Sequence, residues 1–226
     1  MKPEIIRTHA FADDVARFIA DCSREAIDDY GHFRLSLSGG NTPRLVYNAL
    51  ALLDCAWSKW IITFGDERCV SPDDPQSNFR MASEAFLLVT TPGQVHRIQG
   101  EMPPEEAARV YDRTIGQLAT RFGEERCRHD LTLLGLGDDG HTASLFPDTA
   151  ALAETQRNVV SNFVPKFNTH RITATYPLLN ASRRIAFLVN DKKKQNIVDG
   201  VWRGEAGYPA SRVQPEAGAL LWFIGE

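Results

Sequence analysis

The sequence lacks the features that mark membrane-spanning, secreted and zinc-binding proteins. No stretch approaches the ~18 apolar residues of a membrane span, and the start of the chain leads into no apolar run of the signal-peptide kind. The cysteines lie far apart, without a C-x-x-C pair, at Cys22, Cys55, Cys69 and Cys127. This distribution favours unpaired thiols in a reducing compartment over a disulfide framework or a zinc site. We therefore expect a cytoplasmic protein without a membrane partner or a bound metal.

Excess positive charge and internal repeats are also absent. The net charge is −4 and the longest basic run is Lys192-Lys193-Lys194, which argues against nucleic acid as the main partner. No linker or low-complexity segment divides the 226 residues, so we expect a single domain over residues 1–226. An apolar fraction of 43% and a charged fraction of 24% are ordinary for a soluble globular protein. Composition leaves open whether the protein is a monomer or a small homo-oligomer.

Hydrophobic periodicity predicts alternating strands and helices. Apolar residues at helical spacing from Phe11 to Ala26 indicate a first helix. Further helices are predicted over residues 43–53, 78–88, 104–122 and 192–202. Strands are predicted over residues 33–37, 60–64, 131–134, 159–163, 172–175, 185–189 and 220–224, with a long loop over residues 65–77. This alternation is typical of an α/β fold with a mostly parallel central sheet and helices on both faces.

The segment from Gly135 to Pro147, GLGDDGHTASLFP, places glycines, carboxylates and a histidine directly after a buried strand. Gly135 to Gly140 also matches G-x-G-x-x-G, the dinucleotide-binding pattern. That pattern requires a long helix after its third glycine, whereas Pro147 limits any helix here to about two turns. The two aspartates would also repel a pyrophosphate. We therefore expect a small-molecule site at this strand end, where open α/β sheets bind ligands.

A second glycine-rich turn, Ser38-Gly39-Gly40-Asn41-Thr42-Pro43, lies between a predicted strand and a predicted helix. The glycines allow a ligand to approach the backbone, and the amides at a helix N-terminus attract an anion. No Gly-Lys-Ser/Thr follows, so a phosphate monoester fits better than a nucleotide triphosphate. An ordinary turn with Thr42 as the N-cap explains the same residues equally well.

Charged residues follow the strand over residues 60–64. In Gly65-Asp66-Glu67-Arg68, the guanidinium of Arg68 is suited to bind an anion, and Asp66 or Glu67 to hold that arginine or contact hydroxyls. Ser77-Asn78-Phe79-Arg80 offers an N-cap and another anion ligand. Solvated structural roles for these residues remain open.

Further cations come late in the chain. Lys166 and Arg171 flank a predicted strand, and Lys192-Lys193-Lys194 opens a predicted helix. One of these lysines is able to reach the strand-end site while the others are solvated.

His141 is the histidine in a chemically suggestive context, because the other five sit in plain polar surroundings. Next to Asp139 it suits a general base, since a carboxylate fixes the tautomer of an imidazole and raises its basicity. A metal site is a weaker alternative, because no second histidine lies at ligand spacing. A nucleophilic pair with Ser144 is another, although the G-x-S-x-G elbow is missing.

Taken together, these motifs resemble the 6-phosphogluconolactonases of the glucosamine-6-phosphate isomerase/6-phosphogluconolactonase family, and the resemblance runs across nearly the whole chain. It rests on the segments that begin at Ser38, Gly65, Ser77 and Gly135, together with Arg171-Ile172-Thr173, Lys194 and Pro209-Ala210-Ser211, which occur in the family's order. The resemblance implies a single-domain, Rossmann-like fold of the glucosamine-6-phosphate isomerase type. It also implies hydrolysis of 6-phospho-D-glucono-1,5-lactone to 6-phospho-D-gluconate, the second step of the oxidative pentose phosphate pathway.

The deaminases of the same family are the nearest alternative. They carry a glutamate where this chain has Phe146, and Asp-Glu-Tyr where it has Asp66-Glu67-Arg68. Both departures favour a lactonase. Asn41 stands where lactonases often have serine, and Asp191 where they usually have glycine before the lysine that corresponds to Lys194. A non-catalytic sugar-phosphate sensor is a further alternative.

The expected reaction needs no cofactor and no covalent nucleophile, because a δ-lactone is an activated ester. We expect His141 to activate water, Asp139 to orient the imidazole, and Arg68 or backbone amides to stabilise the oxyanion. The remaining predicted residues bind the substrate and its phosphate: Ser38, Gly39, Gly40, Asn41, Thr42, Asp66, Arg171 and Lys194, with Asn78, Arg80 and Lys166 as additional candidates.

Overall fold

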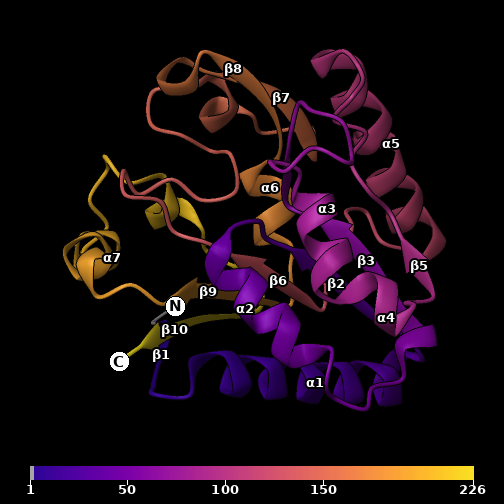
Figure 1. Ribbon diagram of the computed structural model, residues 1–226. Helices are drawn as coiled ribbons and strands as arrows, with labels where there is room; N and C mark the ends of the chain where they lie inside the picture. Colours follow the sequence, from indigo (N-terminus) through magenta and orange to yellow (C-terminus); the bar gives the residue numbers. More distant parts are fainter. Residues whose placement is uncertain (1–2) are drawn as a thin grey trace.

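Seven parallel strands form the central sheet of the computed structural model, which describes residues 3–226 (Figure 1). Their order across the sheet is β1-β10-β9-β6-β2-β3-β5. The strands span Glu4–Thr8 (β1), Phe33–Leu37 (β2), Trp60–Phe64 (β3), Gln94–Val95 (β5), Leu131–Leu134 (β6), Arg184–Val189 (β9) and Ala219–Gly225 (β10). The central strands β2, β3 and β6 are buried along their whole length, as expected for a sheet that is covered on both faces.

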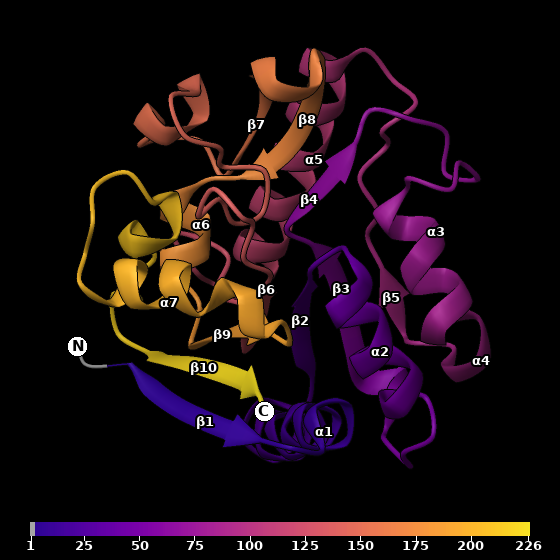
Figure 2. The same ribbon diagram turned by 60° about the vertical axis from the view of Figure 1, so that its left-hand side comes forward.

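Helices cover both faces of this sheet, so the predicted layer architecture is confirmed (Figure 2). Helices α1, α2 and α3 lie on one face, and α5, α6 and α7 lie on the other. Adjacent residues of β10 show this directly: Phe223 packs on Phe18 of α1, whereas Trp222 packs on Trp202 of α7. The helices span Phe11–Tyr30 (α1), Asn41–Leu50 (α2), Asn78–Ala82 (α3), Leu88–Thr90 (α4), Pro104–Arg121 (α5), Tyr176–Asn180 (α6) and Gln195–Trp202 (α7).

The connections leave the sheet in opposite directions from β2 and β6, which are neighbours. The chain moves outward from β2 to β3, whereas after β6 it moves the other way to β9. Right-handed crossovers then place the intervening helices on opposite faces, and a crevice opens at the carboxyl ends of these two strands. Topology alone therefore locates the ligand-binding edge between the segments that follow Leu37 and Leu134.

A second, antiparallel sheet stands beside this edge, and the sequence did not indicate it. It consists of β4 (Asp66–Arg68), β8 (Thr169–Ala174) and β7 (Val159–Val164), in that order. Strand β4 lies within the predicted loop over residues 65–77, because three charged residues carry no strand pattern. Strands β7 and β8 were predicted as strands, but they form a hairpin that packs on α5 rather than joining the parallel sheet.

Other differences concern the ends of elements. Helix α2 begins at Asn41 rather than at Pro43, and a π-helical turn over Ser83–Leu87 joins α3 to α4 within the predicted helix 78–88. The predicted helix 192–202 begins as a 3-10 turn. Strands β1 and β5 were not predicted, because they are edge strands, one largely exposed and one of two residues.

No helix within residues 3–226 has the length and apolarity to cross a membrane.

A buried histidine gives the fold a pH-dependent stability. His129 is 2% exposed and its Nε2 contacts Thr63 Oγ1 of β3 at 2.8 Å. Burial and the charge of Arg34 lower the pKa of His129 to about 3. The unfolded chain takes up this proton below about pH 6.5, whereas the folded chain does not until about pH 3, so stability is lost as the pH falls through this interval.

We expect the free energy of unfolding to fall by about 1.5 kcal/mol between about pH 6.5 and pH 5 on account of His129. Urea denaturation at a series of pH values measures this loss. His129→Gln, which cannot take up the proton, should reduce the loss, whereas His9→Gln at an exposed position should not. An equal pH dependence in wild type and His129→Gln would contradict the assignment.

Candidate active site

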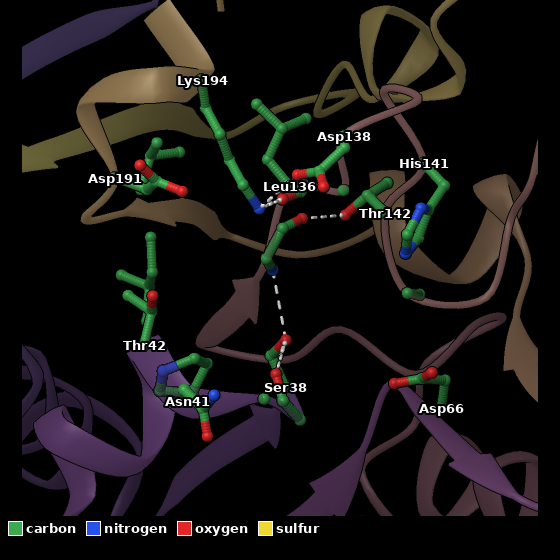
Figure 3. Close-up of a pocket in the computed structure, with 18 of the residues that line it drawn as sticks. Ser38, Asn41, Thr42, Asp66, Leu136, Asp138, His141, Thr142, Asp191 and Lys194 are labelled. Carbon is green, nitrogen blue, oxygen red and sulfur yellow. Dashed lines mark hydrogen bonds and ion pairs between the residues drawn. The ribbon is translucent and has the colours of Figure 1, made fainter. Parts of the chain in front are cut away.

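The carboxyl ends of β9, β6, β2 and β3 border a cleft of about 360 Å³. Its lining comes from the segments that follow these strands and from the hairpin of the smaller sheet. Figure 3 shows Ser38, Asn41 and Thr42 on one side of the cleft, Lys194 and Asp191 across from them, and His141 on a third side. The volume is within the range of small-molecule sites.

The glycine-rich turn after β2 forms one wall. Gly40 is the N-cap of α2 with a φ of 105°, and no side chain caps the helix. The N-cap is therefore not Thr42, the residue expected if this were an ordinary turn. Gly39 permits close packing, because a Cβ there would lie 1.9 Å from the side-chain oxygen of Asn78. The amides at the start of α2 thus face the cleft without an acidic residue in the first helical turn, an arrangement that favours an anion.

The segment after β6 forms the facing wall and is folded back on itself. The amide of Gly137 donates to the carbonyl of His141 at 2.8 Å, and Thr142 Oγ1 donates to the carbonyl of Gly135 at 2.9 Å. Ser38 Oγ accepts a 3.1 Å hydrogen bond from the amide of Gly135, which ties the two walls together. No α-helix starts at Gly140, and the next helical turn is a 3-10 turn at Ala150–Ala153. The geometry of a dinucleotide-binding loop is therefore not formed.

His141 and Asp139 make direct contact, as the sequence predicted. Nδ1 of His141 lies 2.5 Å from Oδ1 of Asp139, and each side chain is 25% exposed. The ring of Phe146 stacks on the imidazole with centroids 3.9 Å apart. Burial opposes charge on Asp139, but hydrogen bonds from Lys166 and His141 outweigh it and lower its pKa to about 2. The carboxylate therefore stays ionised and holds the imidazole with Nε2 as its free nitrogen.

Lys194 enters the cleft from the start of α7. Its ammonium donates to the carbonyl of Leu136 at 2.5 Å and lies 3.3 Å from the carboxylate of Asp138 (Figure 3). Asp191, which replaces the glycine usual at this position, also lines the cleft and caps the 3-10 turn by accepting from the amide of Lys193. Asp191 therefore helps to order this turn, and Lys194 reaches the cleft.

Strand β4 contributes a carboxylate and a guanidinium. Asp66 is 7% exposed, accepts 2.6 Å and 3.2 Å hydrogen bonds from Ser144 and Asn78, and lines the cleft. Ser144 therefore bonds Asp66 rather than His141, so no nucleophilic pair with the histidine is formed. Glu67 does not hold Arg68 through its guanidinium. It accepts hydrogen bonds from backbone amides of Asn78 and Phe79 and so caps α3.

The predicted cations are divided among different places. Arg68, Lys166 and Lys194 line the cleft, whereas Arg171 and Arg80 do not. Arg171 lies directly opposite Arg68 in the pairing of β8 with β4, so their side chains share one face of the small sheet. Arg80 instead contacts Glu84 and the carbonyl of Asp73. It lines an adjoining groove rather than the cleft itself.

Arg68 and Arg171 are two neighbouring cations without a carboxylate partner. Within residues 3–226 neither forms a salt bridge, and Arg68 donates to the carbonyl of Gln76 at 2.5 Å. Burial and the charge of Arg68 lower the pKa of Arg171. Two guanidiniums held together in this way favour an anion between them.

Three features of the site were not predicted. Phe146 stacks on His141, Phe167 from the hairpin lines the cleft, and Gly137 leaves the space that the imidazole occupies. The sequence places the aromatic residues near the motifs but carries no signal for the stacking. In the part of the chain that the structure describes, no group of three or more His, Cys, Asp or Glu side chains is placed to hold a metal ion.

Comparison with known proteins shows the family to which the chain is similar. The family described as Glucosamine-6-phosphate isomerases/6-phosphogluconolactonase matches residues 7–222. The chain is 42% identical over 212 residues to a protein named 6-phosphogluconolactonase from Synechocystis sp., covering 89% of this chain and 85% of the relative. A Nostoc sp. protein of the same name is 38% identical over 206 residues, covering 88% and 84%.

Solved structures are similar over the whole chain. The crystal structure of 6-phosphogluconolactonase from Thermotoga maritima superposes with a TM-score of 0.87 at 28% identity, covering 100% of both chains. The family match and these relatives cover the strand-end cleft together with the sheet that carries it. The chain belongs to the glucosamine-6-phosphate isomerase/6-phosphogluconolactonase family.

Proposed function

We propose that this protein hydrolyses 6-phospho-D-glucono-1,5-lactone to 6-phospho-D-gluconate, the second step of the oxidative pentose phosphate pathway. The observation that carries the proposal is the His141–Asp139 pair, which shares one cleft with a glycine-rich helix N-terminus and several cations. The relatives named 6-phosphogluconolactonase support the same reaction. Polar and cationic groups line the side of the cleft where we place the phosphate, and the base lies on another side. A lactone that carries a phosphate needs both.

His141 is the general base in this proposal. Because Asp139 occupies Nδ1, Nε2 is the nitrogen that takes a proton from water as the water attacks the lactone carbonyl. A C–O bond forms at the carbonyl carbon, and the tetrahedral intermediate then expels the ring oxygen, which receives the proton from the imidazolium. Asp139 stays ionised throughout and orients the ring. Arg68, which lines the cleft, stabilises the oxyanion in this proposal.

The phosphate is the anchor that orients the lactone. The amides at the start of α2, the side chains of Ser38, Asn41 and Thr42, and the ammonium of Lys194 supply donors on one side of the cleft. Asp66 lines the cleft as an acceptor for sugar hydroxyls, and the side-chain amide of Asn78 donates to the carbonyl and the carboxylate of Asp66. Binding energy from the distant phosphate thereby positions the reacting carbon near the base.

A rapid assay on freshly generated lactone tests the proposal. The lactone also hydrolyses unaided, so the rate with protein must be compared with the rate without it in the same buffer. We expect a large excess over the spontaneous rate and no ammonia release from glucosamine 6-phosphate. Ammonia release without lactone hydrolysis would indicate a deaminase, and tight binding of 6-phosphogluconate without turnover would indicate a sensor.

Arg171→Met tests whether the guanidinium that lies opposite Arg68, outside the lining of the cleft, also helps to hold the phosphate. We expect KM for the lactone to rise about ten- to a hundredfold, because a hydrogen bond to a charged group contributes ~1.5–3 kcal/mol. Steady-state kinetics measure the change, with Arg113→Met at an exposed position of α5 as the control. An unchanged KM would show that Arg171 has no part in holding the phosphate.

A further inference from the structure

The hairpin of the smaller sheet makes direct contact with the segment that carries the base. Its turn, Pro165–Phe167, joins β7 to β8 and ends at Asn168 in the left-handed conformation, with a φ of 49°. Lys166 donates from its ammonium to Oδ2 of Asp139 at 2.9 Å. The ring of Phe167 meets the edge of Phe146, the ring that stacks on His141, with centroids 5.7 Å apart.

Both oxygens of Asp139 are therefore engaged by different elements. Oδ1 contacts the imidazole of His141, and Oδ2 contacts the ammonium of Lys166. This arrangement restricts rotation of the carboxylate about its bond to Cβ, and it places a positive charge on the side of Asp139 away from the ring. A cation at that position weakens the attraction between Asp139 and an imidazolium.

We propose that Lys166 is a positioning residue for the base: its ammonium fixes Asp139 against His141 and offsets part of the negative charge that faces the imidazole. The inference rests on the proposed function, because it assigns the base to His141. It gives Lys166 a different role from phosphate binding, for which the ammonium would have to leave Asp139.

Other charged groups face the same cleft. Asp138 and Asp139 belong to the segment of His141 itself, Asp66 and Arg68 come from β4, and Asp191 and Lys194 come from the start of α7. Lys194 is engaged with Leu136 and Asp138, and Asp66 with Ser144. Phe146 covers one face of the imidazole with an uncharged ring. Among the residues that the structure describes, Lys166 is the cation that bonds the carboxylate partner of the base.

The pH dependence of kcat/KM tests the proposal in wild type, Lys166→Met, Lys166→Arg and Lys193→Met. Lys193 is exposed and lines no part of the cleft, so Lys193→Met removes the same charge elsewhere. We expect Lys166→Met to move the acid limb of the profile upward by about half a pH unit, because the lysine side chain is half exposed and its field is screened. KM should stay within about twofold, and Lys166→Arg should restore the wild-type limb.

A second readout does not depend on turnover. The ring-proton resonances of His141, assigned with His141→Gln, report its protonation directly in an NMR pH titration of wild type and Lys166→Met. We expect the titration of the ring to move in the same direction as the acid limb. If wild type proves inactive on the lactone, the proposed function fails while this comparison still decides the role of Lys166.

Three outcomes would overturn the assignment. An unmoved acid limb and unmoved NMR titration in Lys166→Met would show that the ammonium has no influence on the base. A KM raised tenfold or more with an unmoved limb would make Lys166 a phosphate ligand instead. An equal shift of the acid limb in Lys193→Met would show that the shift comes from the overall charge of the protein and not from the contact between Lys166 and Asp139.

Discussion

Replacing His141 with glutamine is expected to lower kcat/KM for the lactone by about 10²- to 10⁴-fold, the usual contribution of a positioned general base. The amide of glutamine keeps the side chain polar and of similar reach, but it cannot take a proton from water at neutral pH. Asp139 would remain ionised, since Lys166 still contacts it. The loss should appear mainly in kcat, because His141 is not among the groups proposed to hold the phosphate.

Stopped measurements on freshly generated lactone, corrected for spontaneous hydrolysis, would give this ratio. Isothermal titration with 6-phosphogluconate would check that binding persists, with a dissociation constant within about threefold of wild type. His9→Gln, at an exposed position that does not line the cleft, is the matched control. Full activity in His141→Gln would place the base elsewhere, and loss of product binding would mean that the histidine anchors the ligand.

The sequence predicts the central sheet and the location of the site because both depend on local signals. Short apolar runs such as Leu131–Leu134 indicate buried strands, and glycines directly after them indicate turns that approach a ligand. The carboxyl ends of parallel strands meet at one edge, so Ser38 and Gly135 were expected to be near one another, and a hydrogen bond joins them. The His141–Asp139 contact was also predictable, since only Gly140 lies between them along a tight turn.

Pairing between distant segments was much less predictable. The antiparallel sheet depends on the alignment of Arg68 with Arg171 across about a hundred residues, for which neither segment carries a signal of its own. The contact of Lys166 with Asp139 is a consequence of that hairpin. Arg80 resembled an anion ligand because it is near Asn78, but helical geometry turns its side chain toward Glu84, four residues further on.

The sequence also could not show where a glycine is needed because a neighbouring side chain fills the space beside it. Gly40 and Gly140 have φ values of 105° and 73°, which explains why glycine is suited to these turns. Gly137 has no such backbone requirement. The reason for its presence is visible only in the structure, where the imidazole of His141 occupies the volume that a side chain would fill.

Gly137→Ala is therefore expected to lower kcat/KM by about a hundredfold or more, nearly as much as removal of the base. A Cβ at this position would lie 2.0 Å from both Nδ1 and Cε1 of His141, far inside van der Waals contact. The ring cannot move toward its other face, because Phe146 is stacked there with centroids 3.9 Å apart. The imidazole must then rotate away and lose its contact with Asp139, so the nitrogen that activates water is displaced.

Gly135→Ala is the matched control for this substitution. It adds the same methyl group two residues away, where the nearest atom of a Cβ would be Ser38 Oγ at 3.6 Å, an ordinary contact. We expect less than about a tenfold loss there, and thermal unfolding should show that both variants fold, with midpoints within a few degrees of wild type. Comparable losses in the two variants would mean that any methyl group in this segment disturbs the site. Wild-type activity in Gly137→Ala would show that the reaction does not need the imidazole in the position that it occupies between Gly137 and Phe146. That result would contradict the assignment of His141 as the base.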